Sequence, residues 1–171
     1  CFLFGPRGTG KTTLLKGLFE GPETLWIDLL SEKEETLFRT RPEEITALLD
    51  GYRYKNVVID EIQKVPKLLD VVQGELLKKR ARFILTGSSA RKLKRGSANL
   101  LGGRAATRYL HPLTHRELAE AFRLEEALSR GTLPELFEIG REAEKDDFLR
   151  SYVSTYLKEE ILVEQLVRKT E

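Results

Sequence analysis

The chain has 171 residues, of which 40% are hydrophobic and 33% are charged, and its formal net charge is +2. This composition predicts a globular protein with one well-buried core and a small appendage, and it excludes an intrinsically disordered chain. No apolar run approaches the roughly 20 residues that a membrane span needs, so we expect no membrane partner and a cytoplasmic location. The single cysteine, Cys1, excludes an intramolecular disulfide and a cysteine metal cluster.

A short apolar strand over residues 1–4 and a glycine-rich segment begin the expected order of elements. Residues 5–12 read GPRGTGKT and satisfy every fixed position of the phosphate-binding pattern GxxxxGK[ST]. Glycine allows backbone N–H groups to approach a triphosphate closely. We expect Lys11 to reach the β- and γ-phosphates and Thr12 to give its hydroxyl to Mg²⁺. The expected nucleotide-binding residues are Gly5, Pro6, Arg7, Gly8, Thr9, Gly10, Lys11, Thr12 and Thr13.

The helix expected over residues 11–20 supplies the context that this pattern needs. The helix would direct its positive dipole end at the anion. A tight turn is the alternative reading of a glycine-rich loop, but a strand before it and an amphipathic helix after it favour a phosphate loop. Apolar residues recur at helical spacing until Gly21-Pro22 ends the run: Leu14, Leu15, Leu18 and Phe19.

Strand and helix patterns then alternate through the first two thirds of the chain. Ser31 is the expected N-cap of the next helix, with Glu34 at the capping-box position. Such alternation predicts an α/β fold, a doubly wound five-stranded parallel sheet flanked by helices. The expected strands cover residues 24–29, 56–59, 83–85 and 105–110, and the expected helices cover residues 32–39, 42–50, 66–79 and 90–101.

Two carboxylates follow the apolar strand at 56–59. Asp60 would hold Mg²⁺ beside Thr12, and Glu61 would polarise a water for attack on the γ-phosphate. A solvated strand end is the alternative, which a preceding phosphate loop makes the weaker one. Gln63 stands where a GTPase switch would need glycine, and no NKxD sequence is present. The pair therefore favours an ATP-hydrolysing protein of the additional-strand class.

Small polar residues end the strand at 83–85, at the position where such ATPases carry a γ-phosphate sensor. Thr86 or Ser88 fits that role. An ordinary helix cap by Ser88 or Ser89 is the alternative, and it does not exclude a sensor.

Positive charge is concentrated in one part of the chain. Residues 76–116 contain eleven Lys or Arg and no Asp or Glu, with clusters at 78–82 and 91–95. A basic patch over residues 78–95 could attract nucleic acid or an acidic partner, and the alternative is a solvated face. No aromatic residue interleaves with these clusters, so the sequence gives no support for base stacking.

The strand pattern stops near residue 113, and helical patterns follow. Thr114 and Glu117 have capping-box spacing, and residues 146–167 form a long amphipathic segment with Phe148, Tyr152 and Tyr156 on one face. We therefore divide the chain into an ATPase core at 1–113 and a helical lid or linker at 114–171, which we expect to be incomplete.

Four strings of residues together resemble a known family. The strings GPRGTGKTTLL, VVIDEIQKVP, FILTGSSARKL and LLGGRA followed by HPLTHREL resemble the prokaryotic AAA+ type ATPases of the AAA_14 class, which are related to archaeal ATPases and usually fused to a DUF4143 domain. The resemblance covers about residues 1–120 and implies an AAA+ core that uses ATP and Mg²⁺. It also implies that Arg104 reaches the nucleotide of a neighbouring subunit, which requires a homo-oligomer or a partner.

These observations predict an ATPase that couples nucleotide hydrolysis to conformational change. The expected catalytic residues are Lys11, Glu61, Thr86, Ser88 and Arg104, and the expected metal ligands are Thr12 and Asp60. Three alternatives remain: a nucleotide-gated binding module, a DNA-associated motor or defence ATPase, and a small-molecule kinase. The kinase is disfavoured because the second carboxylate suits water as the acceptor.

Overall fold

The computed structural model describes residues 1–88, 93, 101 and 105–157. The chain forms two compact units. The first comprises residues 1–6 and 10–110, and the second comprises residues 7–9 and the chain from residue 111 onward. The first unit is an α/β structure and the second is helical.

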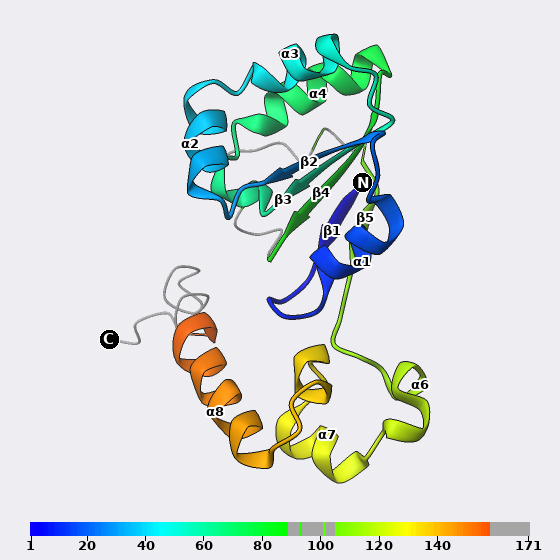
Figure 1. Cartoon of the computed structure of the whole chain (residues 1–171), viewed down its shortest axis with the longest axis vertical. Coiled ribbons are helices and arrows are strands. Elements are labelled where there is room, and N and C mark those ends of the chain that lie inside the picture. The colour runs from blue at the N-terminus through cyan, green and yellow to red at the C-terminus, as the bar shows by residue number, and fades with distance from the viewer. Residues whose placement is uncertain (89–92, 94–100, 102–104, 158–171) are drawn as a thin grey trace, which may run out of the picture. The chain divides into compact units, whose positions relative to one another are not determined.

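Five parallel strands form one sheet in the first unit (Figure 1). They are β1 (Phe2–Phe4), β2 (Thr24–Asp28), β3 (Asn56–Asp60), β4 (Arg82–Gly87) and β5 (Thr107–Tyr109). The strand order is β2-β3-β4-β1-β5, and every neighbouring pair is parallel. The predicted five-stranded parallel sheet is therefore confirmed. Because β4 lies between β1 and β3, the strand before the phosphate loop and the strand before the acidic pair are both its neighbours.

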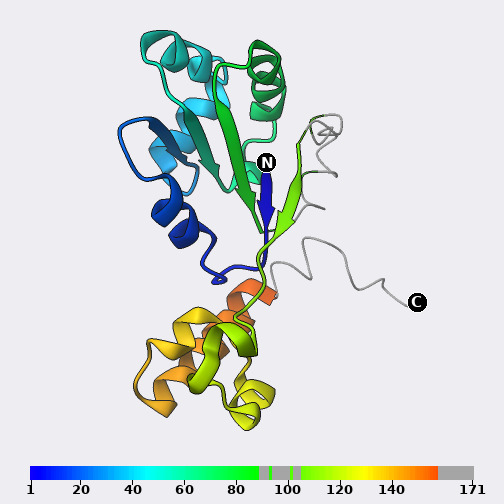
Figure 2. The ribbon, with the colours of Figure 1, turned by 90° about the vertical axis from the view of Figure 1, so that its right-hand side faces the viewer.

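Helices cover both faces of this sheet, as Figures 1 and 2 show. Helix α1 (Lys11–Phe19) packs on one face through Leu15. The other face is covered by α2 (Glu32–Thr40), α3 (Glu44–Gly51) and α4 (Leu68–Lys78). A short 3₁₀ turn, η1 (Ile62–Lys64), follows β3. The fold is thus the layered α/β arrangement that the alternating pattern predicts.

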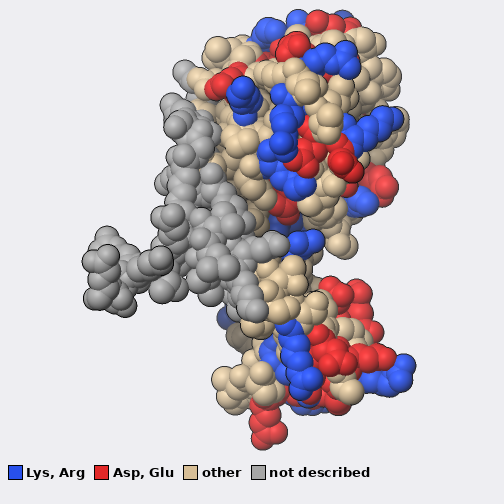
Figure 3. Space-filling view, turned by 90° about the vertical axis from the view of Figure 1, so that its left-hand side faces the viewer, with Lys and Arg blue, Asp and Glu red and all other residues tan. Residues whose placement is uncertain are grey.

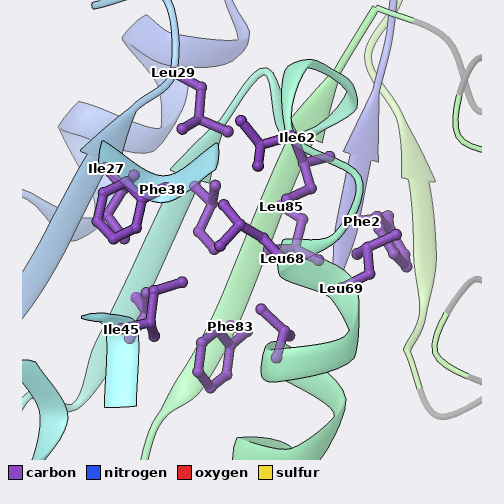
Figure 4. Close-up of a cluster of buried hydrophobic side chains, with 14 of the residues drawn as sticks. Phe2, Ile27, Leu29, Phe38, Ile45, Ile62, Leu68, Leu69, Phe83 and Leu85 are labelled. Atoms are coloured by element: carbon purple, nitrogen blue, oxygen red, sulfur yellow. The ribbon is translucent and has the colours of Figure 1, made fainter. Parts of the chain in front are cut away.

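The core lies mainly between the sheet and helices α2 to α4 (Figure 4). Phe2, Ile27 and Leu85 of the strands pack there with Ile45 of α3 and Leu68 of α4. The middle of β3 is buried on both faces, because the side chains at 57–59 have no exposed area. A continuous apolar run is the expected signature of such a central parallel strand.

The predicted element boundaries agree with the structure within two residues throughout the first unit. The helix predicted over residues 90–101 lies outside the described residues except for Leu93 and Leu101, whose side chains are both buried.

One local prediction in this unit is wrong, because Ser31 is the N-cap of α2 as predicted but the capping box does not form. Ser31 makes no capping hydrogen bond. The Glu34 carboxylate instead accepts a hydrogen bond of 2.5 Å from the Asp28 backbone N–H, at the end of β2. Leu14 and Leu18 are 41% and 64% exposed, because the stripe of α1 that meets the sheet is only wide enough for Leu15 and, in part, Phe19.

The second unit consists of short helical segments. They are α6 (His115–Leu118), η3 (Ala119–Ala121), α7 (Leu124–Arg130), η4 (Pro134–Phe137), α8 (Glu142–Tyr152) and η5 (Val153–Leu157). The predicted capping box is confirmed, since Thr114 and Glu117 cap each other reciprocally. Arg130 links α7 to α8 through Asp146, with Nε and Oδ1 2.8 Å apart, and this contact lowers the pKa of Asp146.

The amphipathic segment predicted at 146–167 begins four residues earlier than expected, at Glu142. Phe148, Tyr152 and Tyr156 lie on one face, with successive ring centroids 6.1 and 5.1 Å apart. The rest of the segment lies outside the described residues. Across the part of the chain that the structure describes, no helix is both long and apolar enough to cross a membrane.

Candidate nucleotide site

The carboxyl ends of β1, β4 and β3 lie side by side at one edge of the sheet. The register pairs Phe4 with Gly87 and Ile59 with Leu85. The segments that leave these strands therefore begin next to one another. In parallel α/β sheets this edge is the usual place for a ligand site.

The phosphate loop, residues 5–13, contains the backbone geometry that its glycines permit. Gly8 and Gly10 have φ values of 77° and 84°, a region that side chains disfavour. Gly10 is also the N-cap of α1. Because glycine has no side chain to cap the helix, no N-cap side chain competes with an anion for the first N–H groups of α1.

Lys11 is the first residue of α1, and its side chain folds back over the loop. The ammonium group donates hydrogen bonds of 2.8 Å to the Gly5 carbonyl and 2.9 Å to the Pro6 carbonyl. The residue is only 6% exposed. A buried ammonium that donates to neutral carbonyls is well placed to donate instead to anionic acceptors, which form stronger hydrogen bonds.

Asp60 connects the loop to β4. Its Oδ2 accepts a hydrogen bond of 2.6 Å from the Thr12 hydroxyl, and its Oδ1 accepts one from the Thr86 hydroxyl. Asp60 and Thr86 are 2% and 0% exposed. The structure thus brings together the two residues predicted to bind the metal, and it adds Thr86 to them.

Thr86 has a second partner. Its hydroxyl oxygen accepts a hydrogen bond of 3.0 Å from the Glu61 backbone N–H. A hydroxyl has one proton, and that of Thr86 is donated to Asp60. One side chain therefore orients both the carboxylate of Asp60 and the backbone of Glu61.

Glu61 lies in a left-handed backbone conformation, with φ 58° and ψ 47°. This conformation is uncommon for a residue other than glycine and costs about 1 kcal/mol or more. The Glu61 side chain accepts a hydrogen bond from Nε2 of Gln63. The predicted water-polarising carboxylate is therefore tethered to the turn that follows it.

Gln63 and Gly87 are the residues of this region that the sequence interpretation missed. Oε1 of Gln63 is buried and has no hydrogen-bond partner among the described residues. A Cβ added to Gly87 would lie only 2.6 Å from this oxygen. Gln63 is two residues after the acidic pair, and Gly87 directly follows Thr86. Aligning β3 with β4 in the sequence would have placed both residues next to the predicted site.

The other predicted site residues are less informative. Ser88 follows β4 and is half-buried, and its side chain makes no hydrogen bond to another described residue. Thr13 is exposed, whereas Thr9 is buried. Arg104 lies outside the described residues.

The oxygen donors at this edge fit a magnesium ion. The Thr12 hydroxyl and the Asp60 carboxylate are hard oxygen ligands, and Mg²⁺ commonly takes one or two such protein ligands together with phosphate oxygens and waters. Within the described residues, no group of three or more His, Cys, Asp or Glu could hold a metal. The donor set thus suits a metal that binds together with a nucleotide.

The basic cluster at 78–82 lies at the opposite edge of the sheet. It spans the end of α4 and the start of β4, whereas the phosphate loop follows the end of β1. The cluster at 91–95 is outside the described residues except for Leu93. The basic residues at 78–82 therefore do not contribute to the nucleotide site.

Two comparisons with known proteins match this chain. A family model described as AAA domain matches residues 1–119, a range that contains the phosphate loop, Asp60, Glu61 and Thr86. The chain is also 32% identical over 132 residues to a protein of Rhodococcus erythropolis named shikimate kinase. That similarity covers 67% of this chain and 77% of the Rhodococcus protein.

Proposed function

The chain belongs to the AAA domain family and is a phosphate-loop nucleotide-binding protein, and from this premise we propose that it is a Mg²⁺-dependent ATP hydrolase. The observation that carries the proposal is the hydrogen-bonded series Thr12–Asp60–Thr86–Glu61. It links the loop, the Asp60 carboxylate and the backbone N–H of Glu61 across three strand ends.

In this proposal the phosphate loop binds the triphosphate of ATP. Lys11 exchanges the carbonyls of Gly5 and Pro6 for phosphate oxygens, which are stronger acceptors because they are charged. The N–H groups of the loop and of the first turn of α1 supply the remaining donors.

Thr12 and Asp60 are the proposed protein ligands of Mg²⁺. When bound, the ion neutralises negative charge on the phosphate oxygens. Thr86 holds Asp60 in a fixed orientation, so we assign it a positioning role in addition to the predicted sensor role. Ser88 remains the alternative sensor.

Glu61 is the proposed group that orients and polarises the attacking water. Gln63 restrains its carboxylate, and the Thr86 hydroxyl restrains its backbone. Release of the Gln63 hydrogen bond would free a Glu61 oxygen for water. Arg104 is the proposed source of a further positive charge, supplied by a neighbouring subunit of a homo-oligomer. The helices from residue 114 onward are the proposed lid or linker that responds to the nucleotide.

Steady-state release of phosphate from ATP and Mg²⁺ tests the proposal, with ATP binding measured in parallel. Glu61→Gln should retain ATP binding while its turnover falls about 100-fold or more, the usual contribution of a catalytic base. Glu44→Gln is the matched control. Glu44 lies at the start of α3, and its carboxylate makes only a weak ion pair, with Oε2 3.9 Å from Nη1 of Arg41. Undiminished turnover in Glu61→Gln would exclude the assigned role.

Phosphate transfer to a small molecule is a second candidate, favoured by the similarity to the protein named shikimate kinase. A transferase would consume ATP only when an acceptor such as shikimate is added, and the acceptor would gain the phosphate. A hydrolase would release inorganic phosphate without it. Product analysis with and without shikimate therefore separates the two candidates.

A further inference from the structure

A groove of about 750 Å³ opens at the amino end of the sheet, at the edge opposite the phosphate loop. It is formed by residues of the segment 49–55, which joins α3 to β3, together with Glu23 and Arg80. We call it the amino-end groove. All of its residues belong to the first unit, and none takes part in the proposed hydrolysis. Its volume lies in the range of about 300–1,000 Å³ that is usual for ligand sites.

Two tyrosines give the groove an aromatic surface. The rings of Tyr52 and Tyr54 contact each other, with centroids 4.6 Å apart and planes inclined by 52°. Tyr54 is partly buried against the core, whereas Tyr52 is 49% exposed. One ring is thus anchored in the protein and supports a second ring that can stack with a flat ligand.

Positive charge surrounds these rings. Arg80 pairs with Asp50, and Lys55 pairs with Glu23 at 2.7 Å. Further cations have no ion pair with any described acidic residue: Arg53, Lys79 and Arg82.

Of these three cations, Arg53 lines the groove, whereas Lys79 and Arg82 only neighbour lining residues through the backbone. The Arg82 N–H donates to the Lys55 carbonyl at 2.9 Å, and Lys79 directly precedes Arg80. The residues that line the groove include three cations, Arg53, Lys55 and Arg80, and two carboxylates, Glu23 and Asp50, so one positive charge is in excess. On the face drawn in Figure 3, Lys and Arg are interspersed with Asp and Glu.

We propose that the amino-end groove binds single-stranded nucleic acid. Aromatic faces next to cations, of which Arg53 has no ion pair with a described acidic residue, are the chemistry that recognises a base and its phosphates together, and each stacked base contributes strongly to binding. Duplex DNA does not offer free base faces to Tyr52, so a basic patch alone would suit a duplex and the tyrosine pair favours a single strand. The sequence interpretation found no aromatic residue near the cluster at 78–82, because the tyrosines come from a segment 26 residues earlier and only the fold brings them together.

Fluorescence anisotropy with a labelled dT oligonucleotide of about 12 bases tests this proposal, in the absence of ATP and at low and moderate salt. We expect saturable binding that weakens as salt increases. Tyr52→Leu should weaken binding about 10-fold, because it removes the ring and keeps an apolar side chain. Arg53→Gln combined with Arg80→Gln should weaken binding and flatten its salt dependence. Lys33→Gln, which removes an exposed charge from α2, is the control and should leave binding unchanged.

Several results would overturn the proposal: no binding at low salt, equal binding by Tyr52→Leu and the unmodified protein, or equally effective competition by duplex DNA. Competition by dTMP as strong as that of the oligonucleotide would show a mononucleotide site and would also overturn it. Thermal unfolding of each variant checks that Tyr52→Leu is folded. Because no ATP is present, the outcome is independent of the proposed hydrolysis.

Discussion

The two ends of the same sheet are built in different ways. At the carboxyl end, Lys11, Asp60 and Thr86 are almost fully buried, and their polar groups are engaged within a short series of hydrogen bonds. At the amino end, Tyr52 and the neighbouring cations are exposed, and their ion pairs lie on the surface.

This difference corresponds to two kinds of task. Chemistry on a phosphate requires donors and acceptors held in a fixed geometry, which burial and hydrogen bonding provide. Recognition of a flexible chain tolerates movement of the binding groups and depends on stacking and screened charge. The following predictions test how far the contrast holds.

The largest expected effect is on nucleotide binding. Lys11→Ala should weaken ATP binding about 100-fold, because it removes a buried cation whose charged hydrogen bonds contribute about 3 kcal/mol. Lys79→Ala, at the amino end, should leave ATP affinity unchanged. Isothermal titration calorimetry measures both. Equal losses in the two variants would remove the distinction between the two ends.

A pair of glycine substitutions compares packing at the carboxyl end of the sheet with an exposed position in the middle of α4. Gly87→Ala should destabilise the protein by about 1–3 kcal/mol, because its Cβ would press on Gln63 and contact Phe4 at 3.4 Å. Gly74→Ala in α4 should stabilise it by about 0.5–1 kcal/mol, since nothing lies within 4 Å of that Cβ and the position is helical.

Chemical denaturation measures both free energies of unfolding. If Gly87→Ala is as stable as the unmodified protein, the packing between Gly87 and Gln63 is looser than the structure indicates.

Glu75 tests whether buried polar groups are equally well satisfied away from the nucleotide site. Its carboxylate accepts from Thr46 and from Lys78, but Oε2 is buried without a hydrogen-bond partner among the described residues. Glu75→Leu should therefore stabilise the protein by up to about 1 kcal/mol, because it removes a desolvated charge while Lys78 remains half-exposed to water. Thermal unfolding checks this, and a clear loss of stability would contradict it.

The smallest effect concerns an exposed ion pair at the carboxyl end. Lys64, in the turn that contains Gln63, donates a hydrogen bond to Glu35 at 2.8 Å and holds the pKa of Glu35 below its ordinary value of 4.5. A lowered pKa means that the contact stabilises the fold above that ordinary value and loses its effect as the pH falls through the lower, folded-state pKa.

Lys64→Gln should accordingly lower the melting temperature slightly near neutral pH and leave it unchanged in acid. Thermal unfolding at both pH values measures this difference. A difference that persisted in acid would show that Lys64 acts through something other than its charge.

The contrast between the two ends also separates what the sequence predicts from what it does not. The succession of strands and helices along the chain, the phosphate loop and the Asp60–Glu61 pair follow from local patterns, because hydrophobic periodicity and motif spacing are properties of neighbouring residues. The structure brings Thr12 and Asp60 within hydrogen-bond distance across 48 positions, as the motif order implied.

The features that were missed depend on contacts between distant segments. The close approach of Gly87 to Gln63 requires the register of β3 against β4, whereas the restraint of Glu61 by Gln63 depends on the left-handed backbone of the turn after β3. The amino-end groove requires the turn after α3 to meet the end of α4. The capping box expected at Ser31 is absent for a similar reason, because the Glu34 carboxylate accepts a hydrogen bond from the Asp28 N–H at the end of β2.

Thr86 links the carboxylate of Asp60 to the backbone of its neighbour Glu61. Its single hydroxyl proton is committed to Asp60, and its oxygen is committed to the Glu61 N–H. Valine would keep the shape of this side chain but would leave the Asp60 carboxylate oxygen and the Glu61 N–H without this partner. Serine would keep both hydrogen bonds. A change that rotates the Asp60 side chain therefore also disturbs the hydrogen bond to the Glu61 backbone. This one hydroxyl couples the orientation of the proposed metal ligand to the position of the residue proposed to orient water.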